Sequence, residues 1–400
     1  MNERELFKET FSNLHASDHT LEEVLGMAEK GRRGKRFVRK STLIGLLAAS
    51  IGTVALAATA GHWSRGLQHQ LQGTTEAMQE LEGKGIASFS DLSVTDEGVT
   101  VTLQQSIVNG AWGYVSFQVS GYELPEGAAP MFETADLTVT DWNGSFGISS
   151  HFDSGLLTDG YKVVGENGQE PETEEDGSLK MYWLDEEGNL EYIFGIYITD
   201  ESGQTRSSLA GREVSVELAG LGFEQGKESC QVQVPGKWKF TFTLPGADES
   251  VCFTEIDKEI GDTGAVLKEV EISPISMSVM YEFPRKVLTE TGYQEEAFTE
   301  ADGAERYESV PFTYEYYEEP PYATGVRLKD GIILWGINAG PGSSGYTDEK
   351  GDIWVNCFGT GKILDAEQIA SILFIDRETL SDQGEIDITE DNCIEVPFRS

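Results

Sequence analysis

Between Lys237 and Leu244 the chain reads KWKFTFTL, in which every second residue is large and apolar. Successive side chains of a β-strand point to opposite faces, so this pattern predicts a half-buried strand with Trp238 and Phe240 turned inward. The same period of two recurs in short segments from Ile86 onward, separated by clusters of Gly, Asp, Asn and Pro. Many short strands with frequent turns and almost no helical period predict a mainly β fold, as a sandwich or a partly open barrel.

The strand pattern divides the region after residue 85 into two predicted β domains, 86–225 and 226–400. One helical island is expected at 365–372, where the period of two is interrupted. The strands expected in the first domain are 99–103, 114–119, 137–140, 192–199 and 214–218, and those in the second are 237–244, 265–272, 277–283, 312–317, 331–337, 353–358 and 394–398.

A single hydrophobic segment precedes the β region. Residues 41–60 read STLIGLLAASIGTVALAATA, and no charged residue occurs between Lys40 and Arg65. A helix of about 20 residues matches a hydrocarbon core about 30 Å thick, so we predict a transmembrane helix over 41–61. A cleaved signal peptide is the alternative, which the small residues at 55–60 permit. The long polar segment ahead of the hydrophobic run favours the anchor.

The charges around this segment predict its orientation. Because a basic cluster stays in the cytoplasm, we expect a single-pass cell-membrane protein with an extracellular C-terminal region. The formal net charge is −40; residues 1–40 hold nine Lys and Arg against seven Asp and Glu, which leaves 20 against 62 for the rest. That acidic excess argues against nucleic acid as a partner. The basic cluster consists of Lys30, Arg32, Arg33, Lys35, Arg36, Arg39 and Lys40.

Apolar residues recur at helical spacing on both sides of the predicted membrane helix. Two short helices within residues 1–40, the second opened by a capping box at Thr20 and Glu23, are too small to build a core. Their stripe is expected to contact a cytoplasmic protein, the membrane surface or, weakly, the other helix, or else to belong to an inert disordered tail. Residues 62–85 are expected to form a helical juxtamembrane stalk. The candidate partner-binding residues are Leu6, Phe7, Phe11, Leu14, Leu21, Val24 and Leu25, and the stalk stripe is Leu67, Leu71, Met78 and Leu81.

The chain lacks a recognisable catalytic, cofactor-binding or metal-binding motif. G-x-S-x-G and H-E-x-x-H are absent, and His151 is the only histidine within the predicted sheets, so we expect no enzymatic activity and no cofactor. Residues 340–345 match G-x-G-x-x-G, but a strand rather than a helix is expected next, which favours a hairpin loop over a dinucleotide site. Acidic clusters at 172–176 and 185–187 are expected to be solvated loops, with a weak calcium site as the alternative.

All four cysteines fall in the predicted second domain, at Cys230, Cys252, Cys357 and Cys393. No C-x-x-C pair occurs, which argues against a zinc or redox motif. An even number of cysteines on the oxidising side of a membrane permits disulfides, and we favour Cys230–Cys252 and Cys357–Cys393 over the two other pairings. Buried thiols are the alternative.

The segment FTYEYY at 312–317 is the best candidate for a recognition surface. Alternation places Phe312, Tyr314 and Tyr316 on one face of a strand. Aromatic residues at a period of two ordinarily face a core, so we expect these three to be buried rather than to form a saccharide-stacking platform.

Short motifs along the whole chain carry a family resemblance. They are Leu14-His15-Ala16-Ser17 with Thr20-Leu21-Glu22-Glu23-Val24-Leu25, the basic run, Ala57-Ala58-Thr59-Ala60-Gly61, Gly236-Lys237-Trp238-Lys239-Phe240 and Ile272-Ser273-Pro274-Ile275-Ser276. With them the chain resembles a large family of uncharacterised Gram-positive membrane proteins. The resemblance implies two tandem immunoglobulin-like β-sandwich domains outside the membrane. Some members look like anti-sigma factors that hold a sigma factor at the membrane, although residues 1–61 lack the cysteines of the zinc-containing pattern.

Two functions follow as hypotheses. In the first, the protein is a non-enzymatic envelope sensor and regulator whose N-terminal helices bind a cytoplasmic partner such as a sigma factor. In the second, it is a cell-surface binding or adhesion module with an inert cytoplasmic tail, which the acidic, aromatic-bearing β region favours.

Overall fold

The computed structural model describes the chain from Trp63 onward, apart from short gaps. Within these ranges, no helix is both long and apolar enough to cross a membrane. The predicted cytoplasmic helices and the predicted membrane helix over 41–61 lie outside the described residues. The described ranges are 63–125, 127–159, 162–165, 168–174, 177–199, 207–224, 230–299, 305–347, 351–375 and 388–398.

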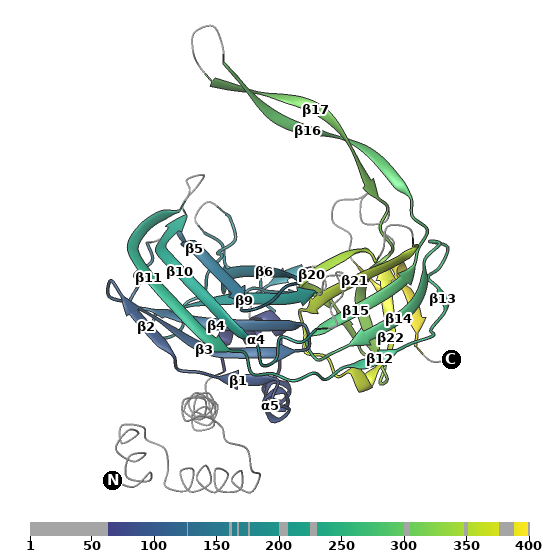
Figure 1. The fold of residues 1–400 in the computed structure, drawn as a ribbon, viewed down its shortest axis with the longest axis horizontal. Helices are drawn as coiled ribbons and strands as arrows, with labels where there is room; N and C mark the ends of the chain where they lie inside the picture. Colours follow the sequence, from purple (N-terminus) through teal and green to yellow (C-terminus); the bar gives the residue numbers. More distant parts are fainter. Residues whose placement is uncertain are drawn as a thin grey trace, which may run out of the picture. The chain divides into compact units, whose positions relative to one another are not determined.

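The fold is mainly β, as the alternation predicted (Figure 1). The first lobe, residues 63–247, holds a sheet in the order β1-β3-β4-β9-β6, with β2 paired to β3, and a second sheet in the order β11-β10-β5. Strand neighbours in both sheets are antiparallel. The bounds are β1 Ala87–Phe89, β2 Ser93–Asp96, β3 Val99–Asn109, β4 Trp112–Ser120, β5 Ala129–Val139, β6 Ser145–Phe152, β7 Leu157–Asp159, β8 Lys162–Val164, β9 Leu190–Thr199, β10 Glu213–Glu224 and β11 Gln231–Thr243.

One hydrophobic core joins the two sheets of the first lobe. Trp238 and Phe240 of β11 are buried in it, as the alternation predicted. The Trp238 indole N–H donates to the carbonyl oxygen of Val99 on β3 at 3.1 Å, so the ring spans from one sheet to the other. Phe240 lies with its ring centroid 5.0 Å from that of Phe117 on β4. Aromatic contacts of this kind supply much of the burial that holds two sheets face to face.

The boundary between the lobes lies later than the predicted 225/226. Strand β11 pairs with β10 along nearly its whole length, with Val214 opposite Phe242 and Leu218 opposite Trp238. A boundary at 225/226 would separate two paired strands that share one core. The strand pattern in the sequence does not show that the strands on the two sides of this boundary pair with each other.

Residues 65–83 pack into the first lobe, where the sequence predicted a stalk. They form two helices, α4 (Arg65–Leu71) and α5 (Thr75–Gly83), separated at Gln72, whose backbone is left-handed. The chain therefore turns, and the two helices do not form one rod. The stripe that we expected on the stalk is fully buried in the core of the lobe and consists of Leu67, Leu71, Met78 and Leu81.

The second lobe, residues 251–398, repeats the two-sheet plan with a core of its own. Its sheets run β12-β14-β15-β21-β20, with β13 paired to β14, and β19-β18-β22-β23. The bounds are β12 Val251–Phe253, β13 Lys258–Glu259, β14 Val266–Ile272, β15 Ser276–Glu282, β16 Val287–Thr299, β17 Glu305–Tyr317, β18 Tyr322–Leu328, β19 Ile333–Trp335, β20 Asn338–Tyr346, β21 Ile353–Thr360, η2 Ala366–Gln368, β22 Ile369–Ile375, η3 Glu390–Asn392 and β23 Ile394–Pro397.

Two local expectations in this lobe were wrong. Residues 365–372 form only the short turn η2 before strand β22, because the apolar residues after 368 pair with β18 and β23. The G-x-G-x-x-G segment lies in strand β20 and not in a loop. A side chain at Gly340 would lie 2.5 Å from the Tyr114 hydroxyl, so glycine is needed there for a close approach between the lobes.

Replacing Trp238 by alanine should destabilise the protein by about 3–5 kcal/mol, because the change leaves a large cavity between the two sheets. The matched control is Lys239→Ala on the exposed face of the same strand, which removes only a surface ion pair with Glu217. We expect that variant to lie within about 1 kcal/mol of the wild type. Urea unfolding followed by tryptophan fluorescence gives both values; equal losses would contradict the role of Trp238.

Candidate binding surface

Strands β16 and β17 form a long hairpin that extends away from both lobes (Figure 1). Their register runs without interruption from Val287 opposite Tyr317 to Thr299 opposite Glu305. In the described part of the chain these two strands pair only with each other. None of their residues whose side chains are described, 287–294 and 309–317, belongs to either hydrophobic core. The hairpin is therefore held by its own ladder and by its attachment at the base.

A row of aromatic side chains, the aromatic strip, lies on one face of this hairpin and consists of Phe312, Tyr314 and Tyr316. Their exposed fractions are 39, 39 and 41%. Ring centroids are 5.5 Å apart between the first two and 5.8 Å apart between the last two. The rings lie over Gly292 on β16, because a side chain there would come within 3.0 Å of the Phe312 ring. The strip is thus a continuous apolar surface across both strands.

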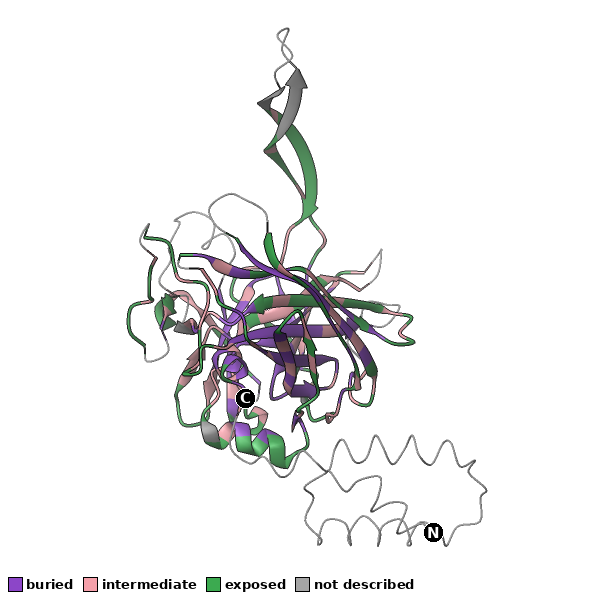
Figure 2. Ribbon diagram, turned by 90° about the vertical axis from the view of Figure 1, so that its left-hand side faces the viewer, coloured by how far each residue is buried: buried purple, intermediate pink, exposed green. Residues whose placement is uncertain are grey.

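The sequence predicted that these three aromatic residues are buried, and that expectation was wrong. Alternation correctly placed them on one face, but no second sheet covers that face. Figure 2 shows the described residues of the hairpin almost entirely exposed, whereas buried residues gather in the strands of the lobes. Contiguous exposed aromatic side chains are uncommon on a soluble surface and mark sites of interaction.

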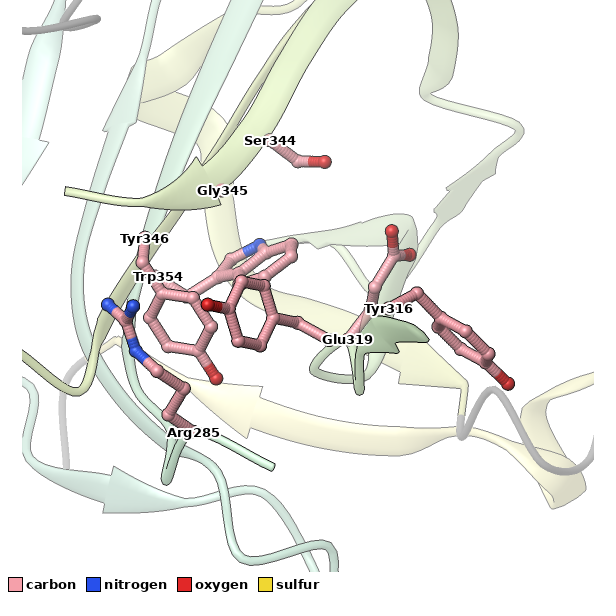
Figure 3. A pocket seen from close by; sticks show the side chains of 8 residues that line it. Arg285, Tyr316, Glu319, Ser344, Gly345, Tyr346 and Trp354 are labelled. Atoms are coloured by element: carbon pink, nitrogen blue, oxygen red, sulfur yellow. The ribbon is translucent and has the colours of Figure 1, made fainter. Parts of the chain in front are cut away.

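A pocket of about 570 Å³ opens at the base of the hairpin, next to the strip (Figure 3). Tyr317 of β17, Tyr346 of β20 and Trp354 of β21 form its aromatic wall. The Tyr346 ring is 5.3 Å from Tyr317 and 4.9 Å from Trp354, in edge-to-face contacts. We call this the base pocket; its other lining residues are Arg285, Tyr316, Glu319, Ser344 and Gly345.

Arg285 fixes the aromatic wall of the base pocket. Its guanidinium lies 4.1 Å from the ring centroid of Tyr346 and 5.2 Å from that of Tyr317, so it makes cation–π contacts with both. Its Nη2 also donates to the Gly351 carbonyl oxygen at 3.0 Å. Burial raises the pKa of the Tyr346 phenol, and the charge of Arg285 lowers it. Tyr346 is therefore neutral at pH 7.

The surface around the strip and the base pocket is acidic. Exposed Glu290 accepts a hydrogen bond from the Tyr314 hydroxyl at 2.8 Å, and exposed Glu315 lies on the opposite face of β17. Glu319 lines the base pocket. Lys286, at the start of the hairpin, pairs with Glu318 at 2.8 Å. Carboxylates beside exposed rings favour a ligand that carries hydrogen-bond donors or positive charge.

A second cleft, of about 330 Å³, lies where the lobes meet and is lined mainly by serines and acids. The polar groups there bond to one another: Ser208 donates to Asp248 at 2.5 Å, and Ser250 donates to Glu271 at 2.7 Å. Among the described residues that line it there is no histidine or lysine. The cleft therefore offers serine hydroxyls without the histidine or lysine base that commonly activates them.

The ionisable groups that resemble catalytic machinery are buried beneath α4. His69 Nδ1 lies 2.7 Å from Asp153 Oδ2, and both side chains are about 5% exposed. Glu191 accepts hydrogen bonds from the Ser64 hydroxyl and from the Gly66 backbone N–H, the latter at 2.9 Å. Sequence analysis missed them because His69 was assigned to an exposed stalk.

The four cysteines lie in described segments, and none forms a disulfide in the structure. The Cys230 sulfur lies 3.8 Å from the Met131 carbonyl oxygen in the first lobe, whereas Cys252 lies in β12 of the second lobe. The two do not flank a hairpin, so the chain between them does not bring their sulfurs together. Cys357 of β21 contacts Ser278, and Cys393 contacts Thr324 in the other sheet. The expected pairs Cys230–Cys252 and Cys357–Cys393 are therefore absent.

The acidic loop at 185–187 is organised by its own hydrogen bonds. Asp185 accepts from the backbone N–H groups of Glu187 and Asn189 and from the side chain of Gln118. Its carboxylate therefore caps a turn. Across the described ranges, no group of three or more His, Cys, Asp or Glu is placed to hold a metal ion.

Comparison with known proteins found one similar solved structure and no family or curated relative. No protein-family model matches the chain, and no curated protein matches it. Among solved structures, the crystal structure of the conserved domain protein from Bacillus anthracis is similar at 13% identity and a TM-score of 0.35. That alignment covers 78% of this chain and 88% of the other. A TM-score at this level says nothing about function.

The buried carboxyl of Glu191 makes stability depend on pH. Burial raises its pKa, and the hydrogen bonds from Ser64 and Gly66 lower it less. Because the folded-state pKa exceeds the unfolded value of about 4.3, this group stabilises the fold below the unfolded pKa, and that contribution is lost as the pH rises through the folded pKa. The free energy of unfolding of the wild type, minus that of Glu191→Gln, should therefore fall as the pH rises above about 4.3.

Urea unfolding at several pH values measures this difference. A difference that rises with pH for Glu191→Gln would contradict the raised pKa.

Proposed function

We propose that the protein is a non-enzymatic, membrane-anchored binding protein whose exported β region holds its ligand at the aromatic strip and the base pocket. The observation that carries this proposal is the exposure of three consecutive strip aromatics on a hairpin that contributes to neither core. Such side chains take no part in the packing of either core, and they provide rigid contact area for a ligand. The groups that resemble catalytic machinery are buried or bonded to one another, which supports binding rather than catalysis.

The proposal includes the finer features expected from the sequence. The two lobes are immunoglobulin-like sandwiches outside the cell, and a single helix over 41–61 anchors them in the membrane. The two-sheet plan of each lobe supports the first statement. The uncharged hydrophobic run behind seven basic residues supports the second.

Changing the strip to serine, as Phe312→Ser, Tyr314→Ser and Tyr316→Ser together, should reduce binding of the purified chain to isolated cell envelopes by at least about tenfold. The thermal midpoint of the two lobes should change little because the three side chains belong to neither core. The matched control is Tyr293→Ser, an aromatic residue on the other face of the hairpin that is 70% exposed. Co-sedimentation measures the binding. Wild-type binding by the triple variant would contradict the proposed function.

A second candidate function, the envelope sensor and regulator resembling an anti-sigma factor, is favoured by the position of α4. The described chain begins at Trp63, and the next residue, Ser64, is already buried and hydrogen-bonded to Gln105 and Glu191. Gly66, Leu67 and Leu71 are buried directly afterwards. In the sequence, this buried segment follows the predicted membrane helix over 41–61 within three residues, and we propose that movements of the β region are passed on to that helix. A displacement caused by a ligand would therefore reach the anchor.

Deleting residues 2–29 separates the two candidates. In the regulator, this deletion removes the predicted helices that contain Leu6, Phe11 and Leu25, so expression of target genes should change while envelope binding by the β region is retained. Transcript profiling of the deletion strain gives the result, and a strain carrying Leu6→Ala and Phe11→Ala serves as a milder version. An unchanged profile would exclude the regulator and leave the binding module.

A further inference from the structure

The hairpin presents two unpaired strand edges. Strands β16 and β17 pair with each other along thirteen residues each and with no other described strand. An isolated two-stranded hairpin is marginally stable in water, and an edge of this length is a template for a further strand. The two edges are not equivalent, and the backbone shows which of them is open.

Pro311 identifies the open edge. The Glu318 backbone N–H donates to the Lys286 carbonyl oxygen at 2.9 Å, so hydrogen-bonded pairs fall on even residue numbers along the uninterrupted register. Pro311 lies opposite Tyr293, in a pair whose backbone groups point outward. It therefore interrupts the outer edge of β17, which then lacks a donor. The outer edge of β16 carries outward N–H and C=O groups at Thr289, Thr291 and Tyr293 without a proline.

The aromatic strip lies over the same edge. The rings of Phe312 and Tyr314 reach from β17 across Gly292 on β16, where a side chain would come within 3.0 and 3.3 Å of them. Glu290, the neighbouring β16 residue on that face, is bonded to the Tyr314 hydroxyl. A strand added to β16 would therefore place alternate side chains beside aromatic rings and a carboxylate.

The negative charge of the protein and of its hairpin indicates which kind of partner strand would bind at the β16 edge. The formal net charge of −40 and the glutamates of the hairpin repel a second copy of this chain and attract a cationic partner. The base pocket already shows the preferred contact, because Arg285 lies over the rings of Tyr346 and Tyr317. Lysine and arginine side chains gain both from aromatic faces and from nearby carboxylates.

We infer that the outer edge of β16 binds an extended, lysine- or arginine-rich polypeptide segment as a third strand, with its basic side chains at alternate positions against the aromatic strip. This rests on the proposed function, since it names the ligand class of the same surface. Backbone hydrogen bonds to β16 supply affinity, and the strip with Glu290 supplies the preference for basic residues.

The probe is a fluorescent peptide of about ten residues that alternates lysine and threonine, titrated into the purified full-length chain. It should bind at least about tenfold more tightly than the same peptide with glutamate in place of lysine, and its affinity should fall as salt is raised. A peptide with all lysines in its first half should bind more weakly than the alternating one.

Two proline variants at one cross-strand pair test the edge. Thr291→Pro removes an outward N–H from β16, and Thr313→Pro removes the outward N–H of its partner on β17. Neither change breaks a bond inside the hairpin. Thr291→Pro should weaken peptide binding by about tenfold, and Thr313→Pro should leave it within about twofold.

Several outcomes would overturn the inference. They are equal affinity for the basic and acidic peptides, equal effects of the two proline variants, and dimers of the chain that dissociate on Thr291→Pro. Binding of a soluble envelope oligosaccharide that is lost in the triple serine variant but kept in Thr291→Pro would also overturn it, while leaving the proposed function intact. If the proposed function itself is wrong, the triple serine variant will bind cell envelopes as well as the wild type does.

Discussion

The hydrophobic core of the first lobe is the constraint on which the rest of the described structure depends. It begins in α4 and α5, passes between the two sheets around Trp238, and includes Ile275 and Cys357 of the second lobe. At 20–33 cal/mol per Å² of apolar area, each fully buried large side chain contributes about 1.5–3 kcal/mol relative to exposure. Moving one lobe against the other, or releasing α4, would therefore expose side chains that are buried now.

Polar bonds fix the direction in which α4 enters this core. Burying a carboxylate such as Glu191 is costly unless donors surround it, and the donors here come from the first residues of α4 and from the residue before it. Apolar packing alone tolerates rotation of a short helix. The hydrogen bonds that the Ser64 hydroxyl and the Gly66 N–H donate to Glu191 form in only one orientation of the helix. The helix is thereby held to β9 by its N-terminal end as well as by its apolar stripe.

The sequence predicted local geometry well and contacts between elements poorly. Alternation identified the inward face of β11 through Trp238, and helical spacing identified the stripe containing Leu67 and Leu71. Neither pattern states what covers the face that it defines. The helical stripe, which we expected on a stalk, is buried in the first lobe. The aromatic residues from Phe312 to Tyr316, which we expected in a core, are exposed.

The remaining misplaced features have the same origin. A boundary between 225 and 226 was inferred from the strand pattern, but the pairing of β10 with β11 joins residues that lie on both sides of it. The glycines of 340–345 resembled a loop because composition does not show that Tyr114, more than two hundred residues away, approaches Gly340. The candidate binding surface was visible as an aromatic run, whereas its exposure followed from the absence of a facing sheet, which is a tertiary property.

The bare strip also explains how so long a hairpin keeps its form. Each of its strands pairs on one side only, and neither contributes to a core, so its ladder competes directly with water. Coverage of Gly292 by the Phe312 and Tyr314 rings offsets part of this weakness, since it excludes water from the most open point of the ladder. The rings do so while remaining about 40% exposed. The side chains that stabilise the free hairpin are therefore the same ones that a bound strand would finish burying, so folding of the hairpin and binding of a ligand are coupled.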